Sequence, residues 1–154
     1  MEYAIAKWLH VLSSTVLFGT GIGSAYYFLA GSLSRDARRA AAIAGYVVVA
    51  DWLFTATTAV IQPLTGYWMM RVAGMGLDAA WLRGSVYLYG LAMACWLPVV
   101  WLQIRLRDLA RQAAAGGSPL PARYWRYFRW WFGLGVIAFL AFVAIFYLMT
   151  VKPA

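Results

Sequence analysis

Four long apolar runs constrain the fold of this chain more than any other feature. A membrane-spanning helix needs about 20 mostly apolar residues, and such runs occupy roughly residues 3–33, 41–70, 86–106 and 130–151. Hydrocarbon offers the backbone no hydrogen-bond partner, so each run must form a helix that satisfies its own amide and carbonyl groups. The sequence therefore predicts an all-α fold, a four-transmembrane-helix bundle that forms a single integral membrane domain over residues 1–154.

The residue composition agrees with this fold class. Hydrophobic residues make up 64% of the chain and charged residues 12%, whereas soluble domains are about half apolar and a quarter charged. The single cysteine, Cys95, excludes an intrachain disulfide and a cysteine-based zinc cluster. The net charge of +8 would suggest nucleic-acid binding in a soluble protein. Here the basic residues bracket apolar runs, so we expect no nucleic-acid partner and instead attraction to anionic lipid headgroups.

The basic residues also predict the orientation. Four of the 13, Lys7, Arg71, Arg83 and Lys152, flank one side of the runs. The other nine flank the first and third connections, namely Arg35, Arg38, Arg39, Arg105, Arg107, Arg111, Arg123, Arg126 and Arg129. By the positive-inside rule these connections are cytoplasmic. We therefore expect a multi-pass protein of the bacterial inner (cytoplasmic) membrane with both termini in the periplasm.

The connections and aromatic residues refine the boundaries. "GGSPLP" (residues 116–121) must end any helix, because two glycines and two prolines cannot continue one. Pro98 lies within the third run and is expected to kink it. Tryptophan and tyrosine collect at membrane interfaces, so "RYWRYFRWW" (residues 123–131) is predicted to be an interfacial anchor.

A polar stripe runs along the second span. It consists of residues at steps of four and three, which share one helix face: Asp51, Thr55, Thr58, Gln62 and Thr65. Asp51 is the only carboxylate within a span, and a charge at mid-bilayer costs on the order of 3 kcal/mol. Asp51 is therefore expected to be protonated, hydrogen-bonded or paired, either in a structural role or in handling a proton, an ion or a ligand.

The third span adds two residues to this intramembrane polar face. Trp96 and Gln103 share one side of the helix near Pro98. That side either lines a pocket or takes part in ordinary helix packing.

The first span holds the only histidine, His10, and a series of small residues. Gly19 and Gly23 form a small-xxx-small pair, which indicates either close helix packing or a cavity that admits a flat cofactor. His10 lies near the outer end, level with residues 65–69 and far in depth from Asp51, so no direct pair is expected. It is either hydrogen-bonded between helices, a proton relay, or a haem or metal ligand with Met69 or Met149 as partner.

No motif of a soluble enzyme is present. "GTGIG" (residues 19–23) lies within a span with no preceding strand, so it is not a dinucleotide fingerprint. No paired carboxylates and no Ser-His-Asp set occur at matching depths. The catalytic residues, if the protein is an enzyme, are not defined by the sequence.

Several segments together resemble a bacterial family of small predicted integral membrane proteins of unknown function. They are "KWLHVLSSTVLFGTGIGSAYYF", "VVVADWLFTATTAVIQPLTGYWM", "LYGLAMACWLPVVWLQIRLRDLA", "LPARYWRYFRWWFGLG" and "FYLMTVKP". More distantly, the first-span histidine is similar to that of the CopD-like membrane proteins, which include the HemJ-type protoporphyrinogen oxidases. This second resemblance implies haem b as cofactor and His10 as an axial ligand.

Two functions therefore stand as hypotheses. The first is a haem- or metal-associated redox protein of HemJ-like type that uses His10. The second is a non-enzymatic membrane subunit, an assembly partner or a small permease-like component, that uses the polar face around Asp51. In the second case the partner is a second copy of the chain or another membrane subunit.

Overall fold

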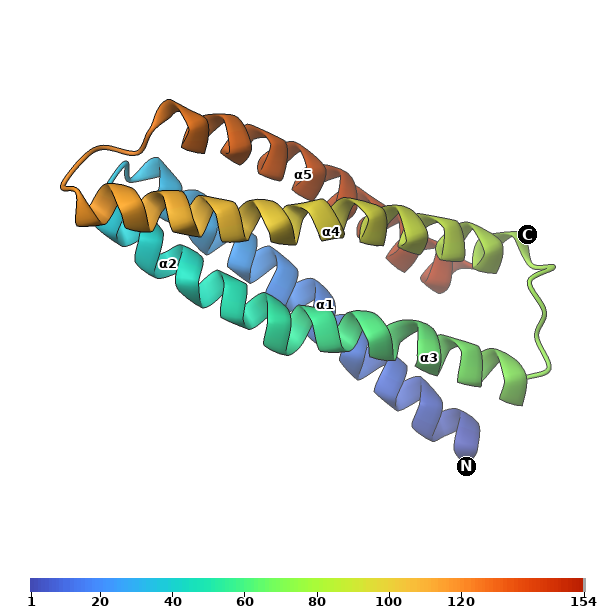
Figure 1. Cartoon of the computed structure of the whole chain (residues 1–154). Helices are drawn as coiled ribbons and strands as arrows, with labels where there is room; N and C mark the ends of the chain where they lie inside the picture. Colours follow the sequence, from blue (N-terminus) through green and yellow to red (C-terminus); the bar gives the residue numbers. More distant parts are fainter. Residues whose placement is uncertain (154) are drawn as a thin grey trace.

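The computed structural model describes residues 1–153, and the regular elements in that range are all helices (Figure 1). The long helices are α1 (Glu2–Leu33), α4 (Ala80–Ala115), α5 (Ala122–Val151), and a second helix made of α2 (Ala37–Ala50), the π-helical turn η1 (Asp51–Thr55) and α3 (Ala56–Val72). All four are long and apolar enough to cross a membrane. The predicted all-α, four-span fold is thus confirmed.

Local sequence signals set the ends of these helices. The Asp36 side chain accepts hydrogen bonds from the backbone N–H groups of Arg38 and Arg39, which caps α2. Gly117 adopts a positive φ of 60° after α4, and Pro121 precedes the first residue of α5. The prediction that "GGSPLP" ends the helix is confirmed. α4 continues through Pro98 as one helix, and the second helix contains a π-helical turn, η1.

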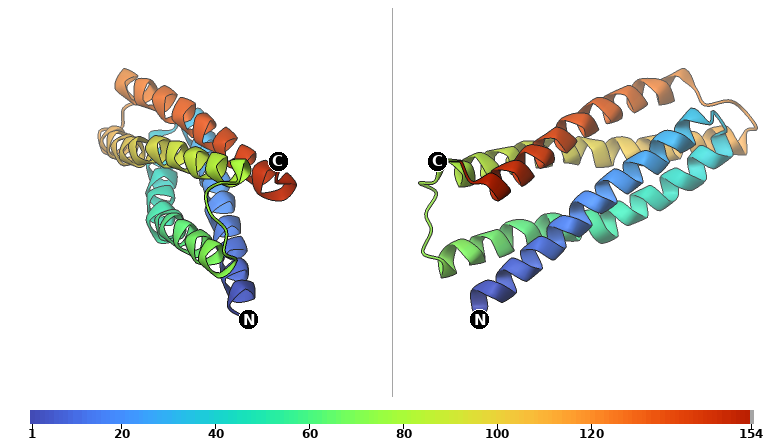
Figure 2. Two further views of the ribbon diagram at one scale, coloured as in Figure 1. Left: turned by 90° about the vertical axis from the view of Figure 1, so that its right-hand side faces the viewer. Right: turned by 180° about the vertical axis from the view of Figure 1, so that it is seen from behind.

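The helices pack as two pairs that diverge at one end. α1 lies against α2, η1 and α3, whereas α5 lies mainly against α4, and α2 joins the pairs through α4. At the end that holds the connections 34–36 and 116–121, all four helices are close together (Figures 1 and 2). At the end that holds both termini, α1 and α3 separate from α4 and α5. We call these the closed end and the open end.

The main hydrophobic core lies toward the closed end. Buried alanines on α2, including Ala40 and Ala44, let this helix approach α4 closely. Phe28 of α1 meets Trp131 of α5 edge to face, with ring centroids 4.7 Å apart. Helices α1, α2, α4 and α5 all contribute to this core.

The segment "RYWRYFRWW" is more than an interfacial anchor. Tyr124, Phe128 and Trp131 are spaced by four and three residues, and all three are buried on one face of α5. The Tyr124 hydroxyl shares a hydrogen bond of 2.6 Å with the Ser32 hydroxyl of α1. The arginines and Trp130 occupy the exposed face. The interpretation of the whole segment as an anchor is therefore wrong for this buried face, which belongs to the core.

Candidate functional site

The π-helical turn η1 positions the carboxyl group of the second span. Asp51 and Thr55 are both buried, and the Thr55 hydroxyl donates a hydrogen bond of 3.0 Å to Asp51 Oδ1. π-Helical turns are rare and occur frequently at functional sites. This one holds Asp51, an acidic residue that is 4% exposed, which makes its surroundings the first place to look for a site.

A cavity of about 400 Å³ lies beside Asp51, within the range of about 300–1,000 Å³ that is usual for small-molecule sites. Its wall is formed by α1, η1, α4 and α5, and most of the residues that line it are apolar. The exceptions are Ser24, Tyr26, Asp51, Thr55 and Gln103. The cavity is therefore an apolar chamber with a few polar groups, as ligand sites are.

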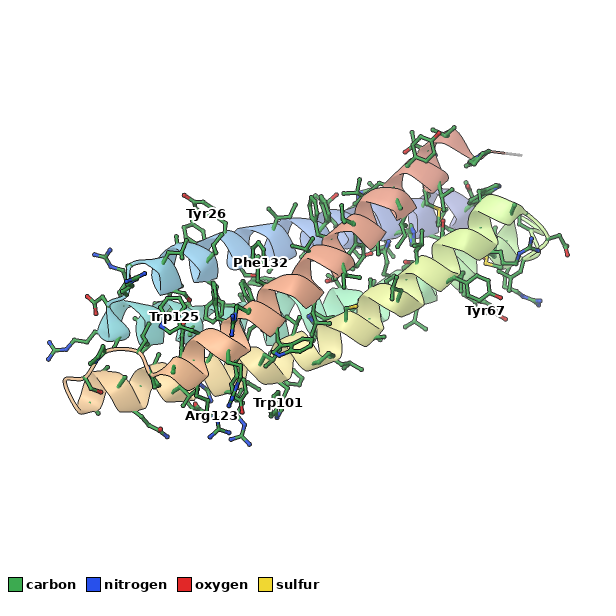
Figure 3. All side chains as sticks on the ribbon, turned by 90° about the horizontal axis from the view of Figure 1, so that it is seen from above. Tyr26, Tyr67, Trp101, Arg123, Trp125 and Phe132 are labelled. Carbon is green, nitrogen blue, oxygen red and sulfur yellow. The ribbon has the colours of Figure 1, made fainter. Side chains whose placement is uncertain are left out.

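The opening of this cavity lies between α1 and α5. Tyr26 on α1 and Phe132 on α5 both line it, and they are 64% and 48% exposed. Figure 3 shows these two side chains near each other on the outside of the bundle. The cavity therefore reaches the outer surface of the helix bundle between α1 and α5.

Three buried polar atoms near the cavity lack a partner. Trp96 Nε1, Gln103 Oε1 and Trp131 Nε1 have no hydrogen-bond partner within residues 1–153, although all three residues line the cavity. The atoms themselves have almost no accessible surface, so a molecule in the cavity would meet other atoms of these side chains. An unpaired buried donor or acceptor costs about 1–3 kcal/mol.

One glycine of the first span borders this cavity. A Cβ atom at Gly19, Gly21 or Gly23 would meet nothing within 4 Å outside its own local helix. Gly19 and Gly23 therefore do not make the close helix contact that a small-xxx-small pair allows, although Gly23 borders a second pocket together with residues of α2. Gly21 lines the cavity, so the absence of a side chain there enlarges the chamber.

A second polar cluster joins α1 to α3 toward the open end. His10 Nδ1 lies 2.9 Å from Thr65 Oγ1, and His10 Nε2 lies 3.1 Å from Gln62 Nε2. The Ser13 hydroxyl donates to Gln62 Oε1, which orients the Gln62 amide with its N–H toward His10. Thr65 donates its own proton to the Ile61 carbonyl at 2.9 Å, so His10 Nδ1–H donates to Thr65 and Nε2 accepts from Gln62.

This geometry does not fit a haem or metal site. A metal ligand needs a free lone pair on a ring nitrogen, and the Nε2 lone pair of His10 is taken by Gln62. No hydrogen bond in the described chain connects the ring to Met69 or Met149. Within residues 1–153 no group of three or more His, Cys, Asp or Glu residues could hold a metal.

The predicted polar face divides between these two clusters. Asp51, Thr55, Trp96 and Gln103 line the cavity, while Gln62 and Thr65 bind His10. Thr58 donates to the carbonyl of Phe54 at 2.5 Å and thus satisfies itself within its own helix. Asp51 and Thr65 are 14 residues apart in the sequence, about 21 Å along a helix axis, so the clusters are separate sites.

Sequence reasoning missed Trp131 and Ser13. Trp131 was expected at the membrane interface, but it lines the cavity and is 4% exposed. Its spacing from Phe128 and Tyr124 was the signal that could have placed it inside. Ser13 lies three residues from His10 on one helix face, which was the corresponding signal for the second cluster.

The fold defines this chain as an integral membrane protein with four transmembrane helices. Residues 4–153 match the family described as "Predicted integral membrane protein (DUF2269)", and the chain belongs to this family. Comparison with curated proteins and with solved structures gave no match. The resemblance to CopD-like and HemJ-type proteins therefore stays a hypothesis.

Proposed function

We propose that this protein binds a lipid-soluble small molecule in the cavity between α1, η1, α4 and α5. The observation that carries the proposal is a cavity of about 400 Å³ whose wall is largely apolar and includes the polar side chains of Asp51, Thr55 and Gln103. Such a chamber suits a ligand with an apolar body and a polar end. The exposed lining residues on α1 and α5 give such a ligand a route from the bilayer.

This proposal develops the hypothesis of a non-enzymatic membrane component that uses the polar face around Asp51. A bound ligand would be stored, presented to a partner or moved between leaflets. The Asp51 carboxyl group lies at the polar wall of the chamber. Within residues 1–153 the one ion pair joins Arg107 and Asp108, so Asp51 has no cationic side chain as a partner.

A pair of glycine substitutions tests the proposal. Gly21→Leu places a side chain in the chamber, whereas Gly19→Leu adds the same side chain at a position that does not line it. Proteins purified in mild detergent are extracted with organic solvent, and the lipophilic compounds retained are quantified by mass spectrometry. We expect a compound that co-purifies with the wild type and with Gly19→Leu, and falls more than tenfold in Gly21→Leu. Identical extracts from all three proteins would contradict the proposal.

We also propose that the closed end faces the cytoplasm and contacts anionic lipid headgroups of the bacterial inner membrane. The basic residues gather there, and two arginines lie against aromatic rings of the outer surface. Arg105 lies 5.4 Å from the Trp101 ring centroid, and Arg123 lies 5.2 Å from that of Tyr127. Figure 3 shows Trp101 and Arg123 on the same side of the bundle. Arginines held beside interfacial aromatic rings are well placed for lipid phosphates.

Cysteine labelling in intact cells tests this orientation. In a Cys95→Ser background, Ser118→Cys lies in the connection at the closed end and Ala73→Cys in the connection at the open end. A membrane-impermeant maleimide is expected to label only the cysteine at position 73. Labelling at position 118 alone would reverse the orientation.

The redox hypothesis has less support from the geometry. It rests on the resemblance of the His10 region to HemJ-type proteins, whereas both ring nitrogens of His10 are hydrogen-bonded. An absorption spectrum and metal analysis of the protein in mild detergent decide between the redox function and the ligand-binding function. We expect no Soret band; a stoichiometric band that is lost in His10→Ala would favour the redox function instead.

A further inference from the structure

We propose that the closed end projects from the membrane as a basic helical cap, and that its outermost arginines bind an acidic segment of a protein partner. The cap consists of residues 34–45 and 102–129. This binding surface is separate from the cavity, and it lies farther from the membrane than the lipid contacts proposed above.

The length of α4 shows that it cannot lie wholly within a bilayer. It has 36 residues, which is about 54 Å at about 1.5 Å per residue, whereas the hydrocarbon layer is about 30 Å thick. Even at a tilt of about 40°, the largest that is usual, α4 would cover about 41 Å of depth. The end of α4 and the connection 116–121 form the outermost part of the closed end (Figures 1 and 2).

A belt of exposed aromatic side chains marks the level at which the closed end leaves the hydrocarbon. Tryptophan and tyrosine collect at membrane interfaces. The belt lies six to fourteen residues from the closed-end termini of the four long helices and consists of Tyr26, Tyr27, Tyr46, Trp101 and Trp130. Figure 3 shows Tyr26 and Trp101 on opposite sides of the bundle. We infer that this belt is the boundary between the hydrocarbon and the cap.

The surface of the bundle changes at this belt. On the membrane side the second helix exposes large apolar side chains, such as Val49, Phe54 and Leu64. In the cap no large apolar side chain is exposed, and the exposed positions hold arginine, proline and small or polar residues. Its interior contains fully buried residues such as Leu106 and Ala110. An apolar interior within a polar surface is the pattern of a bundle that stands in water.

The cap carries positive charge that the chain does not neutralise. It holds nine arginines, two aspartates and no lysine, which gives a net charge of +7. Asp36 accepts hydrogen bonds from the backbone at the start of α2, and Asp108 pairs with Arg107 in the one ion pair within residues 1–153. A guanidinium group binds a carboxylate through two parallel hydrogen bonds. Acidic side chains of a partner would therefore complement this surface.

The position of the arginines separates two groups. The inner arginines lie at the belt and are Arg105, Arg123 and Arg129. The outer arginines are Arg35, Arg38 and Arg39. Arg38 is eight residues from Tyr46 on one helix, about 12 Å along the axis, whereas the headgroup layer is only about 5–8 Å thick. Side chains lean toward the N-terminus of a helix, so Arg38 and Arg39 at the start of α2 lean away from the membrane.

The surroundings of the outer arginines favour a protein as the partner. Lipid phosphates lie in the headgroup layer, closer to the membrane than these arginines. Single-stranded nucleic acid is held by bases that stack on aromatic side chains, and residues 34–45 include no aromatic residue other than the tyrosine that follows them, Tyr46 of the belt. Arginine is enriched where proteins meet.

Two spin labels on one face of α4 test whether the cap stands in water. In a Cys95→Ser background, Ala94→Cys and Gln112→Cys are both exposed and are separated by 18 residues, about five helical turns. In reconstituted bilayers we expect the label at position 112 to be relaxed by a water-soluble nickel chelate and the label at position 94 by oxygen. Equal relaxation of both labels by oxygen would overturn the cap.

Two matched triple variants test the binding surface. The outer variant carries Arg35→Gln, Arg38→Gln and Arg39→Gln, and the inner variant carries Arg105→Gln, Arg123→Gln and Arg129→Gln. Each loses the same charge. A fluorescent polyglutamate peptide is titrated onto the protein in phosphatidylcholine nanodiscs, which expose both faces and offer no anionic lipid. We expect the outer variant to bind on the order of tenfold more weakly than the wild type and the inner variant less than about threefold more weakly.

The other outcomes contradict the proposal in distinct ways. Equal weakening in both variants would mean that net charge alone attracts the peptide and that the outer arginines form no surface. No binding of the peptide to the wild type would overturn the acidic partner. Tighter binding of an oligothymidylate of the same charge, lost in the outer variant, would assign the surface to nucleic acid instead. None of these results depends on a ligand in the cavity.

Discussion

The two polar clusters of the membrane region differ in how completely they are satisfied. In the cluster around His10, side chains of α1 and α3 pair with one another, and both ring nitrogens are used. Around the cavity, one pair joins Thr55 to Asp51, and three other polar atoms have no partner within residues 1–153. A satisfied network holds helices together, whereas a largely apolar chamber with a few polar side chains suits a ligand. We therefore expect a structural role for the first cluster and, under the proposed function, a binding role for the second.

The largest expected effect comes from removing the centre of the satisfied cluster. His10→Ala leaves the Gln62 amide and the Thr65 hydroxyl without their shared partner and opens space beside Gly66. We expect a loss of about 2–3 kcal/mol in the free energy of unfolding. Unfolding of the purified protein by SDS, followed by circular dichroism, measures it. A destabilisation below about 0.5 kcal/mol would contradict the structural role that we expect for the cluster around His10.

The same substitution at the two glutamines gives the most direct comparison. Gln62→Leu removes an amide that donates to His10 Nε2 and accepts from Ser13, so we expect a destabilisation of about 1–2 kcal/mol. Gln103→Leu removes an oxygen that has no partner in the described chain and puts an apolar group of similar size in its place. We expect this protein to be as stable as the wild type, or more stable by up to about 1 kcal/mol.

The control for this comparison is the expression level and helical content of each variant. Both variants should retain the circular dichroism spectrum of the wild type, because leucine is a good helix former. If Gln103→Leu loses as much stability as Gln62→Leu, the Gln103 side chain has a structural partner and the contrast between the clusters is wrong.

The fold could be predicted from the sequence to a large extent, because length and hydropathy decide it. Four apolar runs allow only helices in hydrocarbon, and Asp36 and "GGSPLP" mark boundaries through local backbone chemistry. The π-helical turn could not be predicted in this way. It is a change of hydrogen-bond register over Asp51–Thr55, and no residue type in that segment requires it.

The site could be predicted only in part. The periodicity placed Asp51 and Thr55 on one interior face, and the structure places both at the cavity. Glycines such as Gly21 are ambiguous in a sequence, because close helix packing and an open chamber both require a small residue. Trp131 is ambiguous because an indole suits an interface and a core equally well. Only the packing of α5 against α1 and α4 shows that Gly21 borders a chamber and that Trp131 lies in the core.

The smallest expected effect concerns Asp51. It tests whether the carboxyl group of this residue contributes to ligand binding in the cavity. Asp51→Asn keeps an oxygen that can accept from the Thr55 hydroxyl, the contact that the carboxyl group makes at 3.0 Å. Under the proposed function the wall of the chamber is largely apolar, so the amount of co-purifying compound should change by less than about threefold, which is under 1 kcal/mol. Stability should change by about 0.5 kcal/mol or less. Mass spectrometry of the extracted compounds and SDS unfolding measure the two quantities.

A large effect of Asp51→Asn on binding would change the kind of ligand that we expect. A loss of binding of tenfold or more in Asp51→Asn, with unchanged stability, would mean that the carboxyl group itself holds the ligand. Its natural partner would then be a cation, because the described chain offers Asp51 no ion pair.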